Sequence, residues 1–237
     1  MADRGQYFTQ GDVVARENSV FMTKVYQWMS VGILLTAIVA TVLGTNEEVA
    51  RTIVMNRGLF WVMIIAQFGL VIAVSGFISR MSVLTATVLF LLYSALTGVT
   101  FSTLFMIYTA SSIQSAFFTT AIGFGGLTAF GYVTKKDLGP VGTFCSMGLW
   151  GLIGYSLLAM FFPSMMGGAA SFVYSMVGLL VFAGLTAYDT QAIKLMGRQA
   201  MSTEDQGRAS ILGALKLYLD FINLFLMILR LTGDRRK

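Results

Sequence analysis

The chain has 237 residues, of which 56% are hydrophobic and 11% are charged, whereas about a quarter of the residues in ordinary soluble domains are charged. Its mean hydropathy of +0.76 indicates a polytopic membrane protein. It contains no histidine and a single cysteine, Cys145, which excludes a His/Cys zinc site, a Cys-His nucleophile pair and an internal disulfide. The net charge of +5 is spread over short loops and the tail, which favours a role in membrane topology over nucleic-acid binding.

Seven apolar runs are each long enough to cross a bilayer as a helix of about 20 residues. We place them at 21–44, 58–78, 83–108, 112–133, 141–162, 170–193 and 209–232. Both prolines, Pro140 and Pro163, fall between expected spans, where a missing N–H is tolerated. The first run is too long for a signal-peptide core and is expected to stay attached. The sequence therefore predicts an all-α membrane protein with a polar tail at 1–20, a seven-helix transmembrane domain at 21–232 and a basic tail at 233–237.

The lysines and arginines of the short connections predict the orientation of the chain. Most of them fall on the side of the N-terminus, namely Arg4, Arg16, Lys24, Arg80, Lys135, Lys136, Lys194, Arg198 and Arg208. Fewer fall on the opposite side, namely Arg51, Arg57, Arg235, Arg236 and Lys237. The positive-inside rule then places the N-terminus in the cytoplasm and the C-terminus outside.

Small residues recur at every fourth position in three of the expected spans, a pattern that lets helix backbones approach closely in lipid. The three sets are Gly32, Thr36, Ala40 and Gly44; Ser94, Gly98 and Ser102; and Ala121, Gly125 and Ala129. We expect these sets to mark helix-packing faces rather than a ligand path.

Two aspartates, Asp189 and Asp220, stand inside the last two spans. An acidic residue at a helix centre opposes insertion by about 2.5 to 3.5 kcal/mol, so a partner or a function must compensate for each of them. The two spans run in opposite directions, which allows the carboxylates to meet. Arg80 lies at a depth similar to that of Asp189, and Lys216 lies one turn before Asp220 on the same helix face. The sequence thus predicts a cluster of two acids and two bases.

Three interpretations of this cluster remain open. In the first, Asp189 pairs with Arg80 and Asp220 pairs with Lys216, and both pairs are purely structural. In the second, the two acids share a proton, titrate as a unit and bind a hard cation once both are ionised. In the third, they form an aspartyl protease dyad, which the sequence disfavours because Asp220 follows Leu219 and has no glycine nearby.

A hard cation needs several oxygen ligands. Calcium, for example, takes six to eight, of which two aspartates supply up to four. Thr190 and Asn223, together with backbone carbonyls and water, are the candidates for completing the shell. Such an incomplete protein cage suits weak and transient occupancy of the site by a cation.

Two segments carry a resemblance to a known family. Residues 184–191 read GLTAYDTQ, and residues 217–225 read LYLDFINLF. Further matching segments are KVYQWM at 24–29, YSALTG at 93–98 and GYVTKKDL at 131–138. Together they resemble the Bax inhibitor-1 family, most closely its bacterial inner-membrane branch, over essentially the whole chain.

The resemblance implies a fold in which six helices surround the last one, and a pH-sensitive calcium leak channel or transporter of the inner membrane. The paired aspartates of the family correspond to Asp189 and Asp220, and its closing arginine corresponds to Arg80, which would latch onto Asp189 in the closed state. We expect no enzymatic activity and no cofactor, with calcium as the transported ion and the lipid bilayer as the surroundings. The alternative is an interaction protein that modulates a membrane protease or a stress or cell-death pathway through helix contacts.

This chain departs from the family pattern at two places. Some members carry a carboxylate within the second helix, where this chain has Gln67 and Gly69. Several have a small alcohol or similar residue where Lys216 stands. A fixed positive charge one turn from Asp220 competes with a divalent cation, so Lys216 bears directly on the calcium interpretation.

Overall fold

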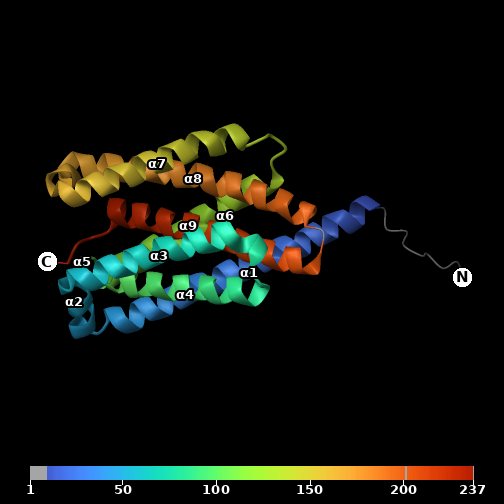
Figure 1. Ribbon diagram of the computed structural model, residues 1–237. Helices are drawn as coiled ribbons and strands as arrows, with labels where there is room; N and C mark the ends of the chain where they lie inside the picture. The colour runs from blue at the N-terminus through green and yellow to red at the C-terminus, as the bar shows by residue number, and fades with distance from the viewer. Residues whose placement is uncertain (1–9, 201, 237) are drawn as a thin grey trace, which may run out of the picture.

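The computed structural model describes residues 10–200 and 202–236 and consists of long helices (Figure 1). Seven helices in this part of the chain are long and apolar enough to cross a membrane. They are α1 (Gln10–Gly44), α3 (Arg57–Phe77), α4 (Val83–Ser102), α6 (Ala110–Val133), α7 (Gly139–Phe161), α8 (Gly168–Gln199) and α9 (Thr203–Thr232). The predicted all-α class and the seven spans are therefore confirmed.

The helices are longer than the apolar runs at several ends. α1 begins at Gln10, so the second half of the segment expected as a polar tail is helical. α8 extends to Gln199 and α9 begins at Thr203, so these two helices continue past the predicted spans on both sides of their connection. Arg4 and Lys237, which entered the predicted orientation, lie outside the described residues.

Short helices and side-chain caps form the connections. The short elements are α2 (Glu47–Met55), η1 (Ile78–Arg80), α5 (Leu104–Ile107) and η2 (Pro163–Met166). Asn46, Asn56, Ser82 and Ser202 each accept a hydrogen bond from a backbone N–H in the first turn of the helix that follows, which satisfies a donor that has no partner within the helix. Pro140 lies in the first turn of α7, where proline is well tolerated.

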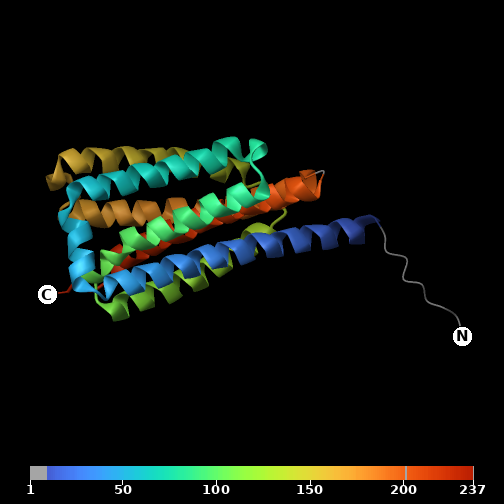
Figure 2. The same cartoon turned by 60° about the horizontal axis from the view of Figure 1, so that its bottom comes forward.

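Helix α9 is the most buried of the spanning helices. Of its most apolar 18-residue window 67% is buried, against 11% to 33% for the other six spans. It packs chiefly against α1, α4, α6 and α8, whereas α3 packs mainly on α4 and α7 mainly on α8. Figures 1 and 2 show α9 running between the other helices. The last helix therefore provides the interior of the bundle.

Two of the three small-residue sets pack against each other as predicted. A side chain on Gly32 would collide with Phe90 and Ser94, and one on Gly98 would collide with α1. The Thr36 hydroxyl donates to the carbonyl of Ser94 at 2.8 Å. These contacts join α1 to α4 along much of their length.

The third small-residue set, on α6, does not pack within the chain. Ala121, Gly125 and Ala129 are all exposed, and a side chain built on Gly125 would meet nothing within 4 Å. This set therefore forms no packing face within the described part of the chain, because the direction it faces depends on how α6 is rotated in the bundle.

The two ends of the bundle differ in what they carry. The start of α1 and the connections α3–α4, α6–α7 and α8–α9 lie at one end, and α2, α5 and the C-terminus lie at the other (Figures 1 and 2). The antiparallel bridge between Tyr108 and Arg235 ties the C-terminal residues to the α5–α6 connection. The loops that carry the two predicted groups of basic residues thus lie at opposite ends of the bundle.

Candidate ion-binding site

Asp189 and Asp220 line one cavity inside the bundle. Its volume is about 660 Å³, and its walls come from α3, α4, α7, α8 and α9. Most of the wall is apolar, but Lys216 and Asn223 also line it. The predicted meeting of the two acids in one site is therefore seen in the fold.

Asp220 is the more deeply buried of the two acids. Only 4% of the residue is exposed, and its Oδ2 atom has no hydrogen-bond partner within the described part of the chain. A buried polar atom without a partner costs about 1 to 3 kcal/mol, and more when it carries charge. Such an atom in a cavity wall requires a ligand, a proton or water.

Asp189 forms an ion pair with Lys216, and this pairing corrects the one expected from sequence. The ammonium Nζ of Lys216 lies 3.5 Å from Oδ1 of Asp189, and their side chains are 37% and 14% exposed. In the first of the three interpretations, Lys216 pairs with Asp220 on its own helix and Arg80 pairs with Asp189. The long lysine stem instead reaches across the interface between α9 and α8, two helices that pack closely together.

Arg80 lies away from this pair. It is exposed in η1, does not line the cavity, and makes no ion pair with any acid among residues 10–200 and 202–236. A different arginine, Arg208 of α9, contacts η1 and the residue that follows it. Arg208 donates to the carbonyls of Ser79 and Met81 at 3.2 and 3.3 Å and pairs with Asp205 at 3.0 Å.

The two supporting residues differ in their placement. Asn223 lines the cavity, and its Nδ2 donates to the carbonyl of Leu219 at 2.8 Å, which leaves its amide oxygen as a candidate ligand. Thr190 is fully buried and donates to the carbonyl of Thr186 at 2.7 Å. It is not among the residues that line the cavity, so the structure does not bring it to the acids.

Close helix packing brings Asp189 to the cavity. A side chain on Gly131 of α6 would collide with the backbone of Ala187, and one on Gly142 of α7 would collide with the ring of Tyr188. The Gln191 amide accepts from the N–H of Leu138 and donates to the carbonyl of Lys136, both at 2.9 Å. Glycines on two neighbouring helices and one amide on α8 thus hold α8 in place around Asp189.

The cavity also holds uncharged polar groups that we had not proposed as ligands. Gln67 of α3 donates to Thr100 at 2.7 Å, and Ser156 and Tyr174 share a hydrogen bond of 2.8 Å. Tyr93 contributes its ring to the wall. A polar residue inside an apolar span was the signal available in the sequence, but it does not indicate which helix face points inward.

The donor set is too small for a permanent metal site. Among the described residues no three of the side chains histidine, cysteine, aspartate and glutamate lie together. Two carboxylates and the Asn223 oxygen supply fewer ligands than the six to eight that calcium takes. The geometry therefore suits a site in which water completes the shell of a passing ion.

Comparison with known proteins identifies the family of this chain. The family model described as "Inhibitor of apoptosis-promoting Bax1" matches residues 18–237. The chain belongs to the Bax inhibitor-1 family. The resemblance drawn from the segments around Asp189 and Asp220 is thereby confirmed.

Relatives match this sequence over nearly their full length. The chain is 47% identical over 218 residues to the inner membrane protein YbhL of Escherichia coli K12, covering 91% of this chain and 92% of the relative. It is 48% identical over 217 residues to an uncharacterized protein of Borreliella burgdorferi, with the same coverage. An uncharacterized membrane protein of Streptococcus pyogenes is 32% identical over 228 residues, covering 95% of this chain and 96% of the relative. The protein is a multi-pass membrane protein of the Bax inhibitor-1 family.

Proposed function

We propose that this protein is a pH-sensitive calcium leak in which Asp189 and Asp220 form the ion and proton site. The observation that carries the proposal is the unpartnered Oδ2 of Asp220, buried in the wall of the cavity that Asp189 also lines. A buried acid in a membrane helix is costly and marks an ion or proton path more often than a structural support.

Charge balance links this site to pH. Lys216 balances one carboxylate, so the second carboxylate requires a proton or a cation when the cavity is closed to water. Protons and calcium then compete for the same oxygens. The rate of such a leak depends on pH because the two aspartates gain and lose protons as a coupled pair, and not because one of them titrates alone.

Lys216 acts as an internal substitute for the transported cation. Its ammonium lies where a calcium ion near Asp189 would be repelled, so this pair represents a closed arrangement. Opening requires Lys216 to swing away or the carboxylates to exchange a proton. Arg80 remains a second proposed latch for Asp189 in the closed state. In the structure Arg80 is exposed in η1, and Lys216 pairs with Asp189 instead.

The direct test uses the purified protein in liposomes loaded with a calcium-sensitive dye. Calcium entry is measured across pH for the parent, for Asp189→Asn and for the matched control Glu204→Gln, an exposed carboxylate outside the cavity. Asp189→Asn should lose most of the pH dependence, whereas Glu204→Gln should keep it. A parent-like pH profile in Asp189→Asn would show that the two aspartates are not the sensor.

We further propose that the protein resides in the inner membrane with its N-terminus in the cytoplasm. The name of the Escherichia coli relative supports the location. The orientation is supported by Arg80, Lys135 and Lys136, whose connections lie at the same end of the bundle as the start of α1 (Figure 1).

A second candidate function is modulation of a membrane protein partner by helix contact. The observation that favours it is the exposed set Ala121, Gly125 and Ala129 on α6, which allows close approach of another helix. Gly125→Ile should abolish such a function and leave calcium flux unchanged, whereas Asp220→Asn should do the reverse. The same pair of variants therefore distinguishes the two candidates.

A further inference from the structure

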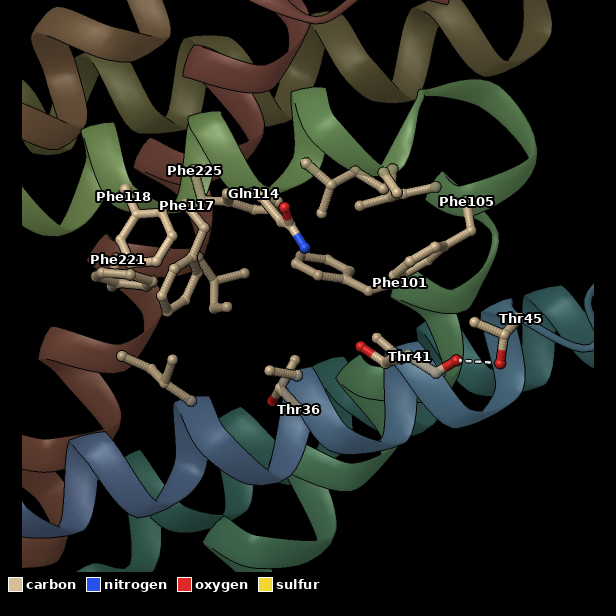
Figure 3. Close-up of a pocket in the computed structure, with 17 residues that line it drawn as sticks. Thr36, Thr41, Thr45, Phe101, Phe105, Gln114, Phe117, Phe118, Phe221 and Phe225 are labelled. Atoms are coloured by element: carbon tan, nitrogen blue, oxygen red, sulfur yellow. Dashed lines mark hydrogen bonds between the residues drawn. The ribbon is translucent and has the colours of Figure 1, made fainter. Parts of the chain in front are cut away.

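A second cavity, separate from the ion site, lies on another side of α9. Its volume is about 540 Å³, and it is enclosed by α1, α4, α5, α6 and α9 (Figure 3). Phenylalanines dominate its wall. None of the described residues that line it carries a charged side chain. The site therefore suits an apolar ligand and not an ion.

The cavity is open at α6. Phe118 on its wall is 65% exposed, and Gln114 is also exposed. Helix α1 packs chiefly on α4, α9 and α8, and α6 packs chiefly on α8 and α9, so the cavity lies where α1 and α6 separate. Because these segments are membrane spans, the opening faces the hydrocarbon of the bilayer and not water.

The length and direction of the cavity match one leaflet. From Ile33 to Thr45, both of which line it, α1 rises about 18 Å at about 1.5 Å per residue. The hydrocarbon depth of one leaflet is about 15 Å, half of the bilayer value. Because α1 reaches α2 and the C-terminal end of the bundle just beyond the cavity (Figures 1 and 2), the cavity extends from that end to about the middle of the membrane.

Most of the wall is apolar. At the inner end Ile33 and Phe221 provide an apolar surface. Midway along the cavity Gln114 points its amide into it (Figure 3), and this amide has no hydrogen-bond partner among the described residues. Thr45, by contrast, already donates to the carbonyl of Thr41 at 2.8 Å. The Gln114 amide is therefore available as a donor to a ligand in the cavity.

A basic residue stands at the outer rim. Arg236 donates from Nη1 to the carbonyl of Phe105 at 3.0 Å, and Phe105 belongs to the cavity wall. The backbone N–H of Arg236 donates to the carbonyl of Ile107 at 2.9 Å. The tail is therefore tied to the rim, and its positive charge complements a phosphate at the membrane surface.

We propose that this cavity binds one acyl chain of an anionic phospholipid from the outer leaflet, in the orientation proposed above, with the chain against the phenylalanines and the headgroup at the rim beside Arg236. Such a ligand fits the depth, the apolar inner end and the charge at the rim. This binding site is independent of the proposed calcium leak, because none of its contacts involves Asp189, Asp220 or Lys216.

The test uses the full-length protein in vesicles of phosphatidylethanolamine and phosphatidylglycerol that contain a phosphatidylglycerol with a photoactivatable diazirine in its acyl chain. After irradiation, the labelled peptides are mapped. The cavity-facing parts of α1 and α6 should be labelled. Ala37→Phe, which fills the cavity, should reduce this labelling about tenfold, equivalent to about 1.4 kcal/mol of binding free energy.

The matched control is Ile38→Phe, which adds the same ring to the next residue of α1, a residue that is 60% exposed and outside the cavity. It should label like the parent. Thr41→Phe, at an exposed part of the wall, is a second filling variant that tests the proposal if Ala37→Phe does not fold. If the parent and a folded filling variant were labelled equally, the label would come from the surrounding lipid and not from the cavity. That result would overturn the proposal. Equal labelling by a zwitterionic phosphatidylcholine probe would overturn the assignment of an anionic lipid.

Discussion

Lys216 and Asp189 form an ion pair across the interface of α8 and α9, with 3.5 Å between Nζ and Oδ1. The pair leaves Asp220, one turn further along α9, with a buried carboxylate oxygen that has no partner within the described residues. One base therefore faces two acids at the cavity, and the predictions for the ion site follow from this imbalance.

Replacing Lys216 should open the leak and weaken the fold. Lys216→Met removes the cation beside Asp189 while keeping an apolar side chain of similar length. Because the lysine is 37% exposed, we expect the free energy of unfolding to fall by about 2 kcal/mol. This lies between the values for surface and for buried ion pairs. Calcium flux at neutral pH should rise by about tenfold or more. Melting temperature and liposome flux are measured on one preparation.

The double variant Lys216→Met/Asp189→Asn provides the control for this change. It removes both charges and should recover most of the lost stability, since no uncompensated carboxylate remains at Asp189. A double variant as unstable as Lys216→Met would contradict the pairing.

Replacing Asp220 should separate stability from function. Asp220→Asn keeps the shape of the side chain but removes a buried charge that lacks a partner, so the melting temperature should stay the same or rise. Calcium flux should fall to the level of empty liposomes. Glu204→Gln, at an exposed acid, should change neither quantity. Retained flux in Asp220→Asn would remove Asp220 from the ion path.

The two arginines near η1 should have different effects. Arg208→Ala removes the hydrogen bonds to two backbone carbonyls and to Asp205. This should lower the free energy of unfolding by about 1 to 2 kcal/mol. Arg80→Ala alters an exposed residue and should change stability by less than about 0.5 kcal/mol. Thermal unfolding in detergent compares them. If Arg80→Ala raised the leak as much as Lys216→Met, Arg80 and not Lys216 would hold the closed state.

Two glycines of α6 provide a matched test of the packing around Asp189. Gly131→Ala would force a methyl group against the backbone of Ala187 and should cost about 1 to 3 kcal/mol. Gly125→Ala enters open space and should cause no loss. Equal melting temperatures for the two variants would mean that α6 does not approach α8 at Gly131.

Reporter fusions should determine the topology. A reporter placed after Lys237 should report an extracytoplasmic location, and one placed within 201–207 should report the cytoplasm. The α8–α9 connection and the C-terminus lie at opposite ends of the bundle (Figure 1). Both reporters on one side of the membrane would refute the seven-span arrangement.

The sequence alone determined the membrane class, the seven spans and the family. Each of these is a property of a continuous stretch of chain, because a helix must offer about 20 apolar residues to the bilayer whatever its neighbours are. Asp189 and Asp220 could be chosen as candidate site residues for the same reason, since a charge within such a stretch is costly wherever it points.

The tertiary structure decided which groups meet. It assigned Lys216 to Asp189, left Arg80 out of the cavity that the acids line, and left Thr190 outside it as well. It also turned the small residues of α6 outward while those of α1 and α4 packed together. These outcomes depend on the rotation of each helix about its axis and on distances of a few ångströms between helices. A sequence pattern gives the face on which a residue lies, but only the packed bundle determines what that face contacts.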